Sequence, residues 1–521
     1  MLARLGRDLP QFVRHPVGDE EALRRVSYNL EHRAERLVAS VESLVFKSPR
    51  SPYLKLLRHA GCELGDFKRL VHDEGVEGAL GALARQGVYA TFDEFKGRTE
   101  AVRGSLRVQF HQDEFDNPVV PPHAVMYSGG SGGRPSRIRY SLQAVEEWAI
   151  SNAAAEQALG LFDVTRAHWW PLPIAAFLTC AALGQDDLWW FYPVYPLPKR
   201  ARLLAAYVRL LCRLGGFPFP APQHRDLDAS DAVATWIADR LATGRQVKFR
   251  ATPSAAARVA VAALDRGRSL DGLTLYLVGE PVTPWRRQQI EATGARVMVL
   301  YGAVELFMMS NSCATPTSAD DVHIMLDLYA MTQRERPAVP GGPLIDATLV
   351  TSLSPVTAKV ALNLEIGDYA RLETRDCGCL LGKLGMRTHL SEIRSFEKLT
   401  SEGVTFARFN LQRILEEAMP RRFGGSGLDY QLAELEGDDG STRFVLRVSP
   451  IIGEIDEAVV SAAFLEELGG NGPVDRHHAE MLRRVGAVLV RREAPVATTA
   501  GKVLPLDLLR STRSADPATG R

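Results

Sequence analysis

The chain has 521 residues. A single hydrophobic core rarely organises so many, so this length predicts two or more domains. Its 62 basic and 62 acidic residues balance, which favours neither a nucleic-acid partner nor another polyanion. No apolar run approaches the ~18 residues of a membrane span, and Met1 to Pro10 carries charges without an apolar stretch, so we expect no secretion signal. Six cysteines in so long a chain do not form a disulfide framework. We expect a cytoplasmic protein.

The first part of the chain is predicted to be helical. Asp19 can cap a helix that extends to about Lys47, because apolar residues recur there at helical spacing. The two prolines between Ser48 and Pro52 end this helix, and a second helical block extends from Tyr53 to about Gln86. Alternation then predicts a strand over 106–110.

The segment from Tyr127 to Ser136 contains four glycines and three serines, between two short apolar runs that predict strands. Backbone N–H groups of such a loop can form a concave anion site, since glycine permits close approach of a ligand. Ser128, Ser131 and Arg134 add polar donors and a charge. A flexible surface turn is the alternative interpretation. The segment is not a Walker loop, because the Gly-Lys-[Ser/Thr] ending is missing.

From Leu142 to Gly302 helix and strand patterns alternate. An Ala-rich helix over 254–266, a strand over 273–278, a helix over 284–293 and a strand over 296–300 predict a βαβ unit with a parallel sheet. Ligands bind at the carboxyl ends of such strands. Here these ends are Gly279-Glu280-Pro281 and Tyr301-Gly302-Ala303-Val304-Glu305.

A β region and a small α+β unit follow. Strands are predicted over 347–353 and 358–364, with a turn at Gly367-Asp368-Tyr369. The character of the chain changes after about Arg394. The elements predicted there are a helix over 409–418, strands over 429–435 and 443–449, a helix over 456–468 and a strand over 487–491. We expect the polar end, from Ser511, to be disordered.

Four motifs occur in a specific order: the Gly/Ser/Arg loop, Y-G-A-V-E (Tyr301 to Glu305), G-D (Gly367-Asp368) and T-A-G-K-V (Thr499 to Val503). Taken singly, each is more typical of a strand end, a turn or a solvated loop. Their joint order resembles the adenylate-forming superfamily of acyl- and aryl-CoA ligases, adenylation domains and luciferases. The resemblance covers nearly the whole chain.

Within that superfamily the chain is most similar to phenylacetate-CoA ligase-like proteins. Their phosphate loop, S-S-G-T-T-G-K-P-T, compares with Ser128 to Ser136, and their hinge, G-R-x-D-D-x-[IL]-x-x-x-G-V-N, compares with Ile393 to Thr405. The resemblance implies an α/β fold. A large N-terminal domain (1–393) would contain stacked mixed and parallel sheets, flanking helices and a β region. A small, mobile α+β C-terminal domain (394–510) and a disordered tail (511–521) would follow.

The resemblance also implies roles in ATP-dependent activation of a carboxylic acid. Glu305 would help to hold Mg²⁺, which prefers oxygen ligands. Asp368 would accept hydrogen bonds from the ribose, with Arg394 nearby, and Lys502 would reach the carboxylate and the α-phosphate in the first half-reaction. The phosphate loop would consist of Ser128, Gly129, Gly130, Ser131, Gly132, Gly133, Arg134 and Pro135. The adenine slot would be lined by Gly279, Glu280, Pro281, Tyr301, Gly302 and Ala303.

Some positions depart from the family's pattern. Val304 stands where a Thr is usual, Gly132 stands where the loop has a hydroxyl residue, and Phe396-Glu397 replaces the first acidic pair of the hinge. These changes fit altered second-step chemistry or a slow enzyme. The presence of Lys502 argues against a catalytically dead protein.

Three cysteines and a histidine lie between the Y-G-A-V-E motif and the hinge. Cys313, His323, Cys377 and Cys379 supply three thiolates and one imidazole, which would make a closed tetrahedral zinc set. Phenylacetate-CoA ligase-like proteins have a similar order of residues. Four unrelated buried residues are the alternative, because free cysteine is often buried. A structural zinc would tie the β region to the main domain.

The acid pocket is expected between the helix after the Gly-rich loop and the strand before Tyr301. The segment His168 to Pro173 and the aromatic run Trp189 to Tyr192 lie in the corresponding region. Aromatic walls suit an aryl or unsaturated acid, and core packing is the equally weighted alternative for any one of these tryptophans.

Three functions stay in competition. The first is an aryl- or acyl-CoA ligase that uses ATP, Mg²⁺ and CoA. The second is an adenylate-forming enzyme with another acceptor: a carrier-protein thiol, a protein cysteine, or a nitrogen nucleophile as in ATP-dependent diazotisation with nitrite. The third is a non-catalytic nucleotide-binding protein. We expect small-molecule partners, neither nucleic acid nor membrane, and a monomer or homodimer.

Overall fold

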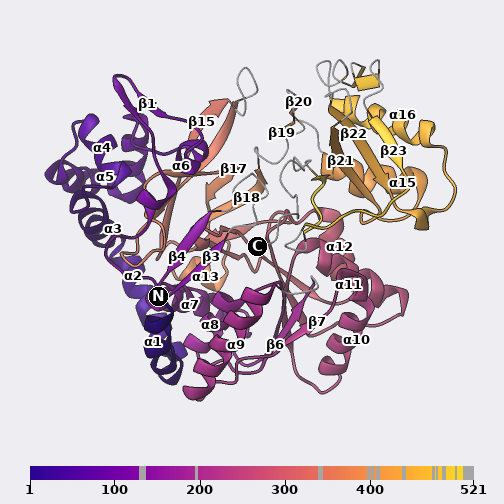
Figure 1. Cartoon of the computed structure of the whole chain (residues 1–521), viewed down its shortest axis with the longest axis horizontal. Helices are drawn as coiled ribbons and strands as arrows, with labels where there is room; N and C mark the ends of the chain where they lie inside the picture. The colour runs from indigo at the N-terminus through magenta and orange to yellow at the C-terminus, as the bar shows by residue number, and fades with distance from the viewer. Residues whose placement is uncertain are drawn as a thin grey trace, which may run out of the picture. The chain divides into compact units, whose positions relative to one another are not determined.

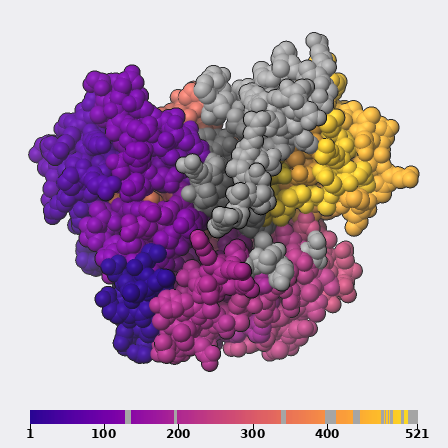
Figure 2. Space-filling view, viewed as in Figure 1, coloured from indigo at the N-terminus to yellow at the C-terminus, as the bar shows by residue number. Residues whose placement is uncertain are grey.

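The computed structural model describes residues 1–127, 136–193, 198–337, 344–395, 400–401, 404–405, 411–436, 442–471, 476, 479–480, 482–483, 488–498 and 502–507. The chain divides into two compact units. The first contains Met1–Arg394, and the second contains Ser395–Thr498 and the segment from Lys502. Figure 1 labels their helices and strands, and Figure 2 shows one face of the surface.

The described part of the first unit contains a six-stranded parallel sheet with the strand order β10-β9-β8-β5-β6-β7. Its strands are β5 (Thr165–Trp169), β6 (Leu188–Tyr192), β7 (Pro222–His224), β8 (Val247–Ala251), β9 (Leu273–Val278) and β10 (Arg296–Leu300). The β9 and β10 strands pair in parallel, as the sequence predicts. All six residues of β9 and four of the five residues of β10 are buried, and only Thr274, Tyr276 and Arg296 carry polar groups, so the two strands form part of a layered core.

Helices pack beside this sheet. The helices α10, α11 and α12 lie side by side (Figure 1), and α7 packs against α8. Their bounds are α7 (Leu142–Ala158), α8 (Ile174–Ala182), α9 (Lys199–Leu214), α10 (Ser230–Leu241), α11 (Pro253–Asp265) and α12 (Pro284–Glu291). Threonines at 252 and 283 cap α11 and α12 through their side chains, each followed by a proline at the first helical position.

The N-terminal region is helical, as predicted, but in shorter pieces. The helix expected from Asp19 to about Lys47 is divided into two α-helices and a π-helical turn, with a break at His32, whose φ is −108°. The helices of this region are α1 (Leu2–Arg14), α2 (Asp19–Glu31), α3 (Arg33–Val41), α4 (Pro52–His59), α5 (Leu64–Arg85) and α6 (Phe92–Lys96). In Figure 2 the indigo surface of this segment adjoins the magenta helices, and α1 packs against α9.

A second sheet in this unit has the strand order β13-β14-β18-β17-β16-β15. Its strands are β13 (Ser310–Ser312), β14 (Val322–Ile324), β15 (Tyr329–Pro337), β16 (Leu344–Ser352), β17 (Leu364–Thr374) and β18 (Thr388–Ser395). The short hairpins are β1 (Ala101–Arg103) with β2 (Leu106–Val108), β3 (Ala124–Tyr127) with β4 (Arg137–Tyr140), and β11 (Gly302–Ala303) with β12 (Phe307–Met308). The short helix α13 (Leu380–Lys383) precedes β18.

Two predictions for this region are wrong. Residues 358–363 form no strand, because β17 begins only at Leu364. Gly367 and Asp368 do not end a strand in a turn but lie inside β17. There Gly367 has a φ of 83°, and the pairing of β17 with β16 shifts between Ala347 and Leu349. A left-handed glycine beside a register shift is typical of a β-bulge, which changes the direction of the neighbouring side chain.

The second unit has its own core and a four-stranded sheet with the order β23-β22-β21-β24. Its strands are β21 (Tyr430–Glu436), β22 (Thr442–Val448), β23 (Val488–Arg491) and β24 (Leu506–Asp507), and β19 (Thr400–Ser401) pairs with β20 (Val404–Thr405). Its helices are α14 (Leu411–Arg413), a π-helical turn (Ile414–Ala418), α15 (Met419–Phe423) and α16 (Glu457–Leu468). In neither unit do the described helices include one with the length and apolar character of a membrane span.

The hairpin that follows β10 requires glycine at one position. A Cβ atom on Gly302 would lie 2.3 Å from the carbonyl oxygen of Phe307 and 2.7 Å from the Cα of Met308. We predict that Gly302→Ala lowers stability by about 1–3 kcal/mol, because backbone atoms cannot give way as a flexible side chain can. Thermal unfolding should show the loss. Gly65→Ala is the control, since nothing lies within 4 Å of a Cβ there; equal melting temperatures would contradict the prediction.

Candidate active site

The Y-G-A-V-E motif forms a tight hairpin at the carboxyl end of β10. Phe307 adopts a φ of 60°, and its ring stacks on Trp148 of α7 with centroids 5.9 Å apart. Trp148 also donates a hydrogen bond from Nε1 to the carbonyl oxygen of Met308, at 3.1 Å. One indole therefore fixes both the side chain and the backbone of the hairpin that carries Glu305.

Glu305 is a buried carboxylate with 8% exposure, and its Oε1 lies 3.0 Å from the Nζ of Lys96. Lys96 also contacts the hydroxyl of Ser136. Burial alone would raise the pKa of Glu305, but the Lys96 charge, helped by hydrogen bonds from Ser136 and Lys96, outweighs burial, so the pKa lies below its usual value. The site therefore holds an ionised carboxylate out of water.

Ser136 brings the Gly-rich segment to this carboxylate. Residues 128–135, the predicted phosphate loop, lie outside the described residues. Their flanks are described: Tyr127 pairs with Arg137 in the antiparallel hairpin of β3 and β4. The loop therefore begins and ends at one place, and its last flanking residue, Ser136, forms a hydrogen bond with Glu305.

No pattern in the sequence indicated Lys96. It ends the short helix α6, some two hundred residues before Glu305, in a segment without any recognisable motif. Its side chain is 8% exposed and lies over the ring of Phe92 at 4.8 Å. Lys96 therefore supplies a positive charge at the Gly-rich end of the site.

The second and third motifs meet through one hydrogen bond. The Tyr301 hydroxyl donates to Oδ2 of Asp368 at 3.0 Å. Burial, then the charge of Asp368, raise the pKa of Tyr301 well above its usual value, so the hydroxyl stays protonated and remains a donor. The bulge at Gly367 is what directs Asp368 toward Tyr301 from inside β17.

Arg394 is tied into the first unit close to this pair. Its Nη1 lies 3.2 Å from Oδ2 of Asp320 and 2.8 Å from the carbonyl oxygen of Ile393. Asp320 also accepts the backbone N–H groups of Glu392 and Ile393. The charge of Arg394 acts on Tyr369, the neighbour of Asp368. Arg394 is therefore held in place at the last residue of the first unit.

The Gly279-Glu280-Pro281 segment follows β9, with Gly279 at a φ of 90°. The carboxylate of Glu280 accepts hydrogen bonds from the backbone N–H and the hydroxyl of Ser254, both at 2.9 Å, and pairs with Arg286 at 3.0 Å. This side chain, 1% exposed, connects the first turns of α11 and α12. Contacts of this segment with a ligand would therefore come from its backbone rather than from the Glu280 carboxylate.

Lys502 lies in a turn of the second unit just before β24. Thr498 and Lys502 close this turn, since the N–H of Thr498 donates to the Lys502 carbonyl at 2.7 Å. The buried amide of Gln431 donates to the carbonyl oxygens of Val496 and Leu504 at 3.0 and 2.9 Å. Gln431 therefore anchors both sides of the Lys502 turn, a role that the sequence did not indicate.

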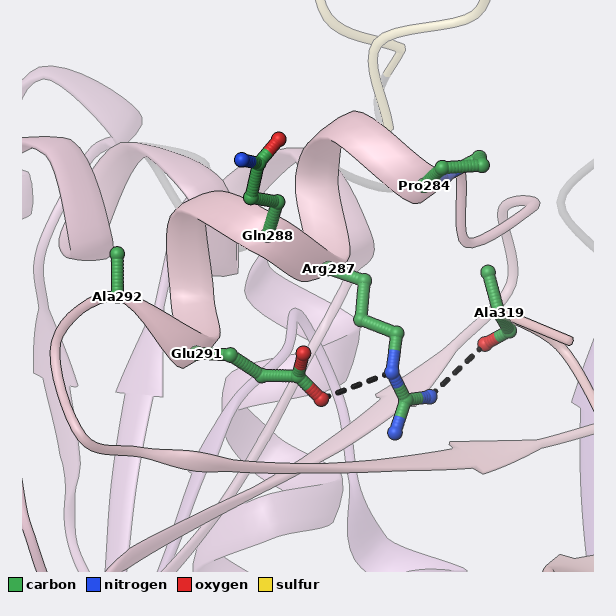
Figure 3. Close-up of a pocket in the computed structure, with 6 residues that line it drawn as sticks. All are labelled: Pro284, Arg287, Gln288, Glu291, Ala292 and Ala319. Atoms are coloured by element: carbon green, nitrogen blue, oxygen red, sulfur yellow. Dashed lines mark hydrogen bonds and ion pairs between the residues drawn. The ribbon is translucent and has the colours of Figure 1, made fainter. Parts of the chain in front are cut away.

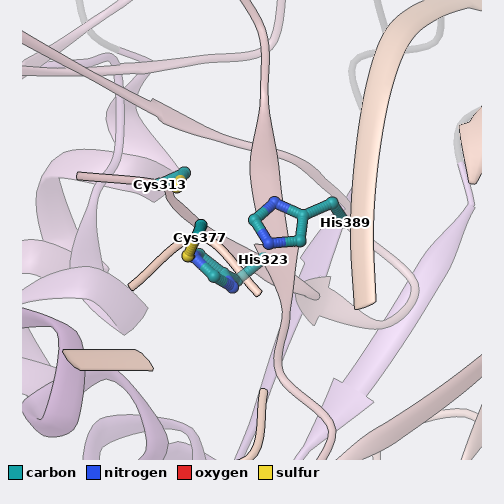
Figure 4. Close-up of side chains that lie close together, drawn as sticks. All are labelled: Cys313, His323, Cys377 and His389. Carbon is teal, nitrogen blue, oxygen red and sulfur yellow. The ribbon is translucent and has the colours of Figure 1, made fainter. Parts of the chain in front are cut away.

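The candidate metal residues gather in the second sheet and the segment before α13. Nitrogen and sulfur atoms of Cys313, His323, Cys377 and His389 all lie within 4.8 Å of one another (Figure 4). Cys379, which the sequence assigned to this set, places its Sγ 3.1 Å from Nε2 of His323. The structure thus brings together the four predicted residues and adds His389.

The hydrogen bonds of this cluster suit a metal. His323 Nδ1 lies 2.6 Å from the Met386 carbonyl, which places the proton on Nδ1 and leaves the Nε2 lone pair facing the cysteine sulfurs. His389 Nδ1 lies 2.9 Å from Oδ1 of Asp321, and its buried Nε2 has no hydrogen-bond partner among the described residues. Arg375 Nη2 also lies 3.1 Å from His389 Nδ1. One imidazole with an oriented lone pair, a second imidazole and three thiols fit Zn²⁺, which takes four such ligands.

Two surface cavities lie elsewhere. The one in Figure 3, of about 420 Å³, is formed by the outer side of α12 and by Ala319. Its Arg287 already pairs with Glu291 at 2.8 Å and donates to the Ala319 carbonyl at 3.1 Å. The other, of about 490 Å³, is lined by residues of α2 and by Arg36 and Glu147. Neither cavity contains a residue that the sequence assigned to the site.

No protein-family model matches this sequence, and no curated protein matches it. Similar solved structures include a 2-hydroxyisobutyryl-CoA ligase with 2-HIB-AMP and CoA (15% identity, 91% of this chain and 92% of that chain, TM-score 0.41). They also include ATP-bound MatB from Rhodopseudomonas palustris (14%, 93% and 91%, 0.39) and the anthranilate CoA ligase AuaEII with anthranoyl-AMP (10%, 76% and 67%, 0.43). At these identities and TM-scores, the likeness does not assign this chain an activity.

We predict that the purified protein contains about one zinc per chain, as four-ligand sites of this kind do. Cys313→Ser, Cys377→Ser and Cys379→Ser should each lose the metal and lower the melting temperature, because metal binding stabilises the folded state. Elemental analysis and thermal unfolding provide the measurements. Cys212→Ser, a buried cysteine outside the cluster, is the control.

His389→Ala separates the possible ligand sets. Retention of zinc in this variant would support the set with Cys379. Loss of zinc in His389→Ala together with retention in Cys379→Ser would replace Cys379 with His389. An absence of zinc from the unaltered protein would contradict the metal site.

Proposed function

We propose that this protein activates a carboxylic acid with ATP, forming an acyl-adenylate and releasing pyrophosphate. The observation that carries the proposal is the position of Glu305. It is a buried, ionised carboxylate, and it lies beside Ser136 at the end of the Gly-rich segment. The Tyr301–Asp368 hydrogen bond supports the proposal, because it brings a further motif of the resemblance, Gly367-Asp368, to the Y-G-A-V-E motif that contains Glu305.

The chemistry of the transfer suits these residues. In-line attack of a carboxylate on the α-phosphorus needs positioned reactants and neutralised phosphate charge. Backbone N–H groups of the Gly-rich loop, Arg134 and Lys96 would bind phosphate oxygens. Glu305 would contribute one oxygen ligand to Mg²⁺, while ATP oxygens and water supply the others. Since Lys96 occupies Oε1 of Glu305, metal binding must share or displace that contact.

The nucleoside would bind at the same edge of the sheet. Asp368, oriented by Tyr301, would accept hydrogen bonds from ribose hydroxyls, with the backbone of residues 279–281 and 301–303 beside the base. Lys502 would approach the reacting carboxylate and the α-phosphate in the adenylation step. Its turn is preorganised by Gln431 within the second unit. Because the backbone around Lys502 is already held in place, less entropy would be lost when its charged side chain is positioned at the reacting groups.

The acceptor and the acid are assigned on weaker grounds. We propose CoA as the acceptor and a cytoplasmic location, both from the resemblance. An aryl substrate has less support than the sequence suggested. Trp169, Phe191 and Trp189 pack against Phe249 and Trp236 in the core rather than forming a separate wall. Transfer to a carrier protein and adenylation of nitrite stay as alternatives.

The first test is pyrophosphate release and pyrophosphate–ATP exchange with a panel of acids, with and without CoA, and with nitrite as a separate arm. We expect acid-dependent exchange and CoA-dependent thioester formation. AMP release without thioester would favour another acceptor. ATP binding without exchange for any acid or nitrite would contradict the proposal and favour a non-catalytic nucleotide-binding protein.

The role of Lys502 has its own test. Lys502→Ala should slow adenylation about 10²–10³-fold, the loss typical of removing one donor to developing charge, while ATP binding changes little. Arg483→Ala, an exposed residue of the same unit that pairs with Glu480, is the matched control. An adenylation rate in Lys502→Ala equal to that of the control would contradict the assigned role.

A further inference from the structure

One face of the parallel sheet carries a buried excess of positive charge. Arg166 of β5 and Lys248 of β8 are register partners, and both pair with the carboxylate of Glu156 from α7. Glu156 also accepts hydrogen bonds from Gln185 at 2.8 Å and Asn152 at 2.9 Å. The carboxylate is thus fully engaged by these two cations and two amides.

Arg250 is the third cation on this face. It lies two residues after Lys248 on β8, so its side chain leaves the same face of the sheet about 6–7 Å closer to the carboxyl end. Arg250 is half-buried, and burial lowers its pKa to about 10, so the guanidinium remains charged at neutral pH. Among the described residues no carboxylate pairs with it.

Two further polar groups on the same face lack a hydrogen-bond partner among the residues that the structure describes. His168 on β5 and Tyr276 on β9 are the register partners of Arg250 on either side. His168 is 6% exposed, and its buried Nδ1 has no hydrogen-bond partner among the described residues; Tyr276 is 2% exposed, and its hydroxyl has none either. Burial, and then the charges of Arg250 and Lys248, lower the pKa of His168 well below its usual value, so the imidazole is neutral.

This arrangement is costly without a ligand. A buried charge needs a counter-charge, and buried polar groups need hydrogen-bond partners. Arg250 pairs with Tyr276, three residues before Gly279, so it lies about 10 Å below the edge where the Y-G-A-V-E hairpin and the Gly279 segment emerge. The carboxylate to be activated must lie at that edge, near the α-phosphate. An anionic group bound at Arg250 would therefore belong to the same acid molecule, at the end farther from the α-phosphate.

We propose that Arg250, flanked by His168 and Tyr276, binds a second anionic group of the acid substrate, so that the preferred substrates are dicarboxylic acids. This proposal rests on the proposed acid-activating function. The guanidinium would pair with the distal carboxylate, and the histidine and tyrosine would supply neutral hydrogen bonds. The group that reacts with ATP would be the other carboxylate.

The test compares acids that differ only in a carboxylate replaced by a methyl group: terephthalate with 4-methylbenzoate, and fumarate with crotonate. Pyrophosphate–ATP exchange and the shift in melting temperature are measured for each acid. We expect the dicarboxylate of at least one pair to be preferred about 10- to 100-fold in kcat/KM, the ratio expected for one hydrogen bond to a charged group. That acid should also raise the melting temperature more than its partner.

Arg250→Met should abolish this preference while exchange with the monocarboxylate persists. Its melting temperature without ligand should equal or exceed that of the unaltered protein, because a half-buried charge without a carboxylate partner among the described residues is removed. Arg245→Met, an exposed arginine just before the same strand, is the matched control and should keep the preference.

Three outcomes would overturn the inference. One is exchange without any preference for a dicarboxylate and without a selective thermal shift. Another is a marked loss of melting temperature in Arg250→Met, which would make Arg250 a structural residue. The third is nitrite-dependent exchange that Arg250→Met abolishes, which would place the reacting anion itself at Arg250. The absence of exchange with every acid and with nitrite is a different result, because it removes the acid-activating function on which the inference rests.

Discussion

The carboxylate of Glu156 holds α7 against the parallel sheet, and the position of the candidate site depends on that attachment. Burial alone would raise the pKa of Glu156, but Lys248 and Arg166 outweigh burial and keep it ionised. Loss of one partner of a buried ion pair leaves an uncompensated charge, which costs about 3–5 kcal/mol. The two bonded cations come from adjacent strands, so the carboxylate fixes both the helix and its register on the sheet.

Because α7 is attached to the sheet, it also positions the hairpin of the Y-G-A-V-E motif. Trp148 lies two turns before Glu156 on the same helix and contacts Phe307 and the carbonyl of Met308. The hairpin is tight because Gly302 permits close approach of Phe307 and Met308. Glu305 can therefore face Lys96 and Ser136 only while α7 keeps its place. The buried ion pairs of Glu156 and the candidate carboxylate of Glu305 are connected in this way through α7.

Local patterns in the sequence were sufficient for part of this arrangement. The apolar runs of β9 and β10 predicted a parallel pair, and the motif order placed Tyr301 and Asp368 at one site, where they are hydrogen-bonded. The bulge at Gly367 was read as a turn, because glycine followed by aspartate is common in both. Whether a glycine forms a bulge or a turn depends on how its strand pairs with the partner strand. The partner strand is distant in the sequence, so a short sequence segment does not reveal this pairing.

The residues that the sequence did not indicate act across long separations. Lys96 meets Glu305 from α6, and Gln431 reaches the Lys502 turn from β21. His389 joins the metal cluster through the pairing of β18 with β14. None of these residues lies in a local motif, since a lone lysine, glutamine or histidine carries no pattern. Their roles follow from tertiary packing, which brings single polar side chains to groups that are already buried.

The buried carboxylate of Glu305 and the half-buried guanidinium of Arg250 differ in how their charges are compensated. In the proposed function, this difference would separate the nucleotide from the acid substrate. Glu305 already has Lys96 as a partner, so in the proposed function a metal and a phosphate would have to arrive together, the metal at Glu305 and the phosphate at Lys96, for neither side chain to lose its counter-charge. Arg250 has no carboxylate among the described residues, so an anion that arrives there relieves a desolvation cost already present in the folded chain. In the proposed function, binding at Arg250 would therefore be selective for an anionic group, whereas binding at Glu305 would depend on the combined arrival of metal and phosphate. A site with both features would discriminate among acids more strongly than among nucleotides.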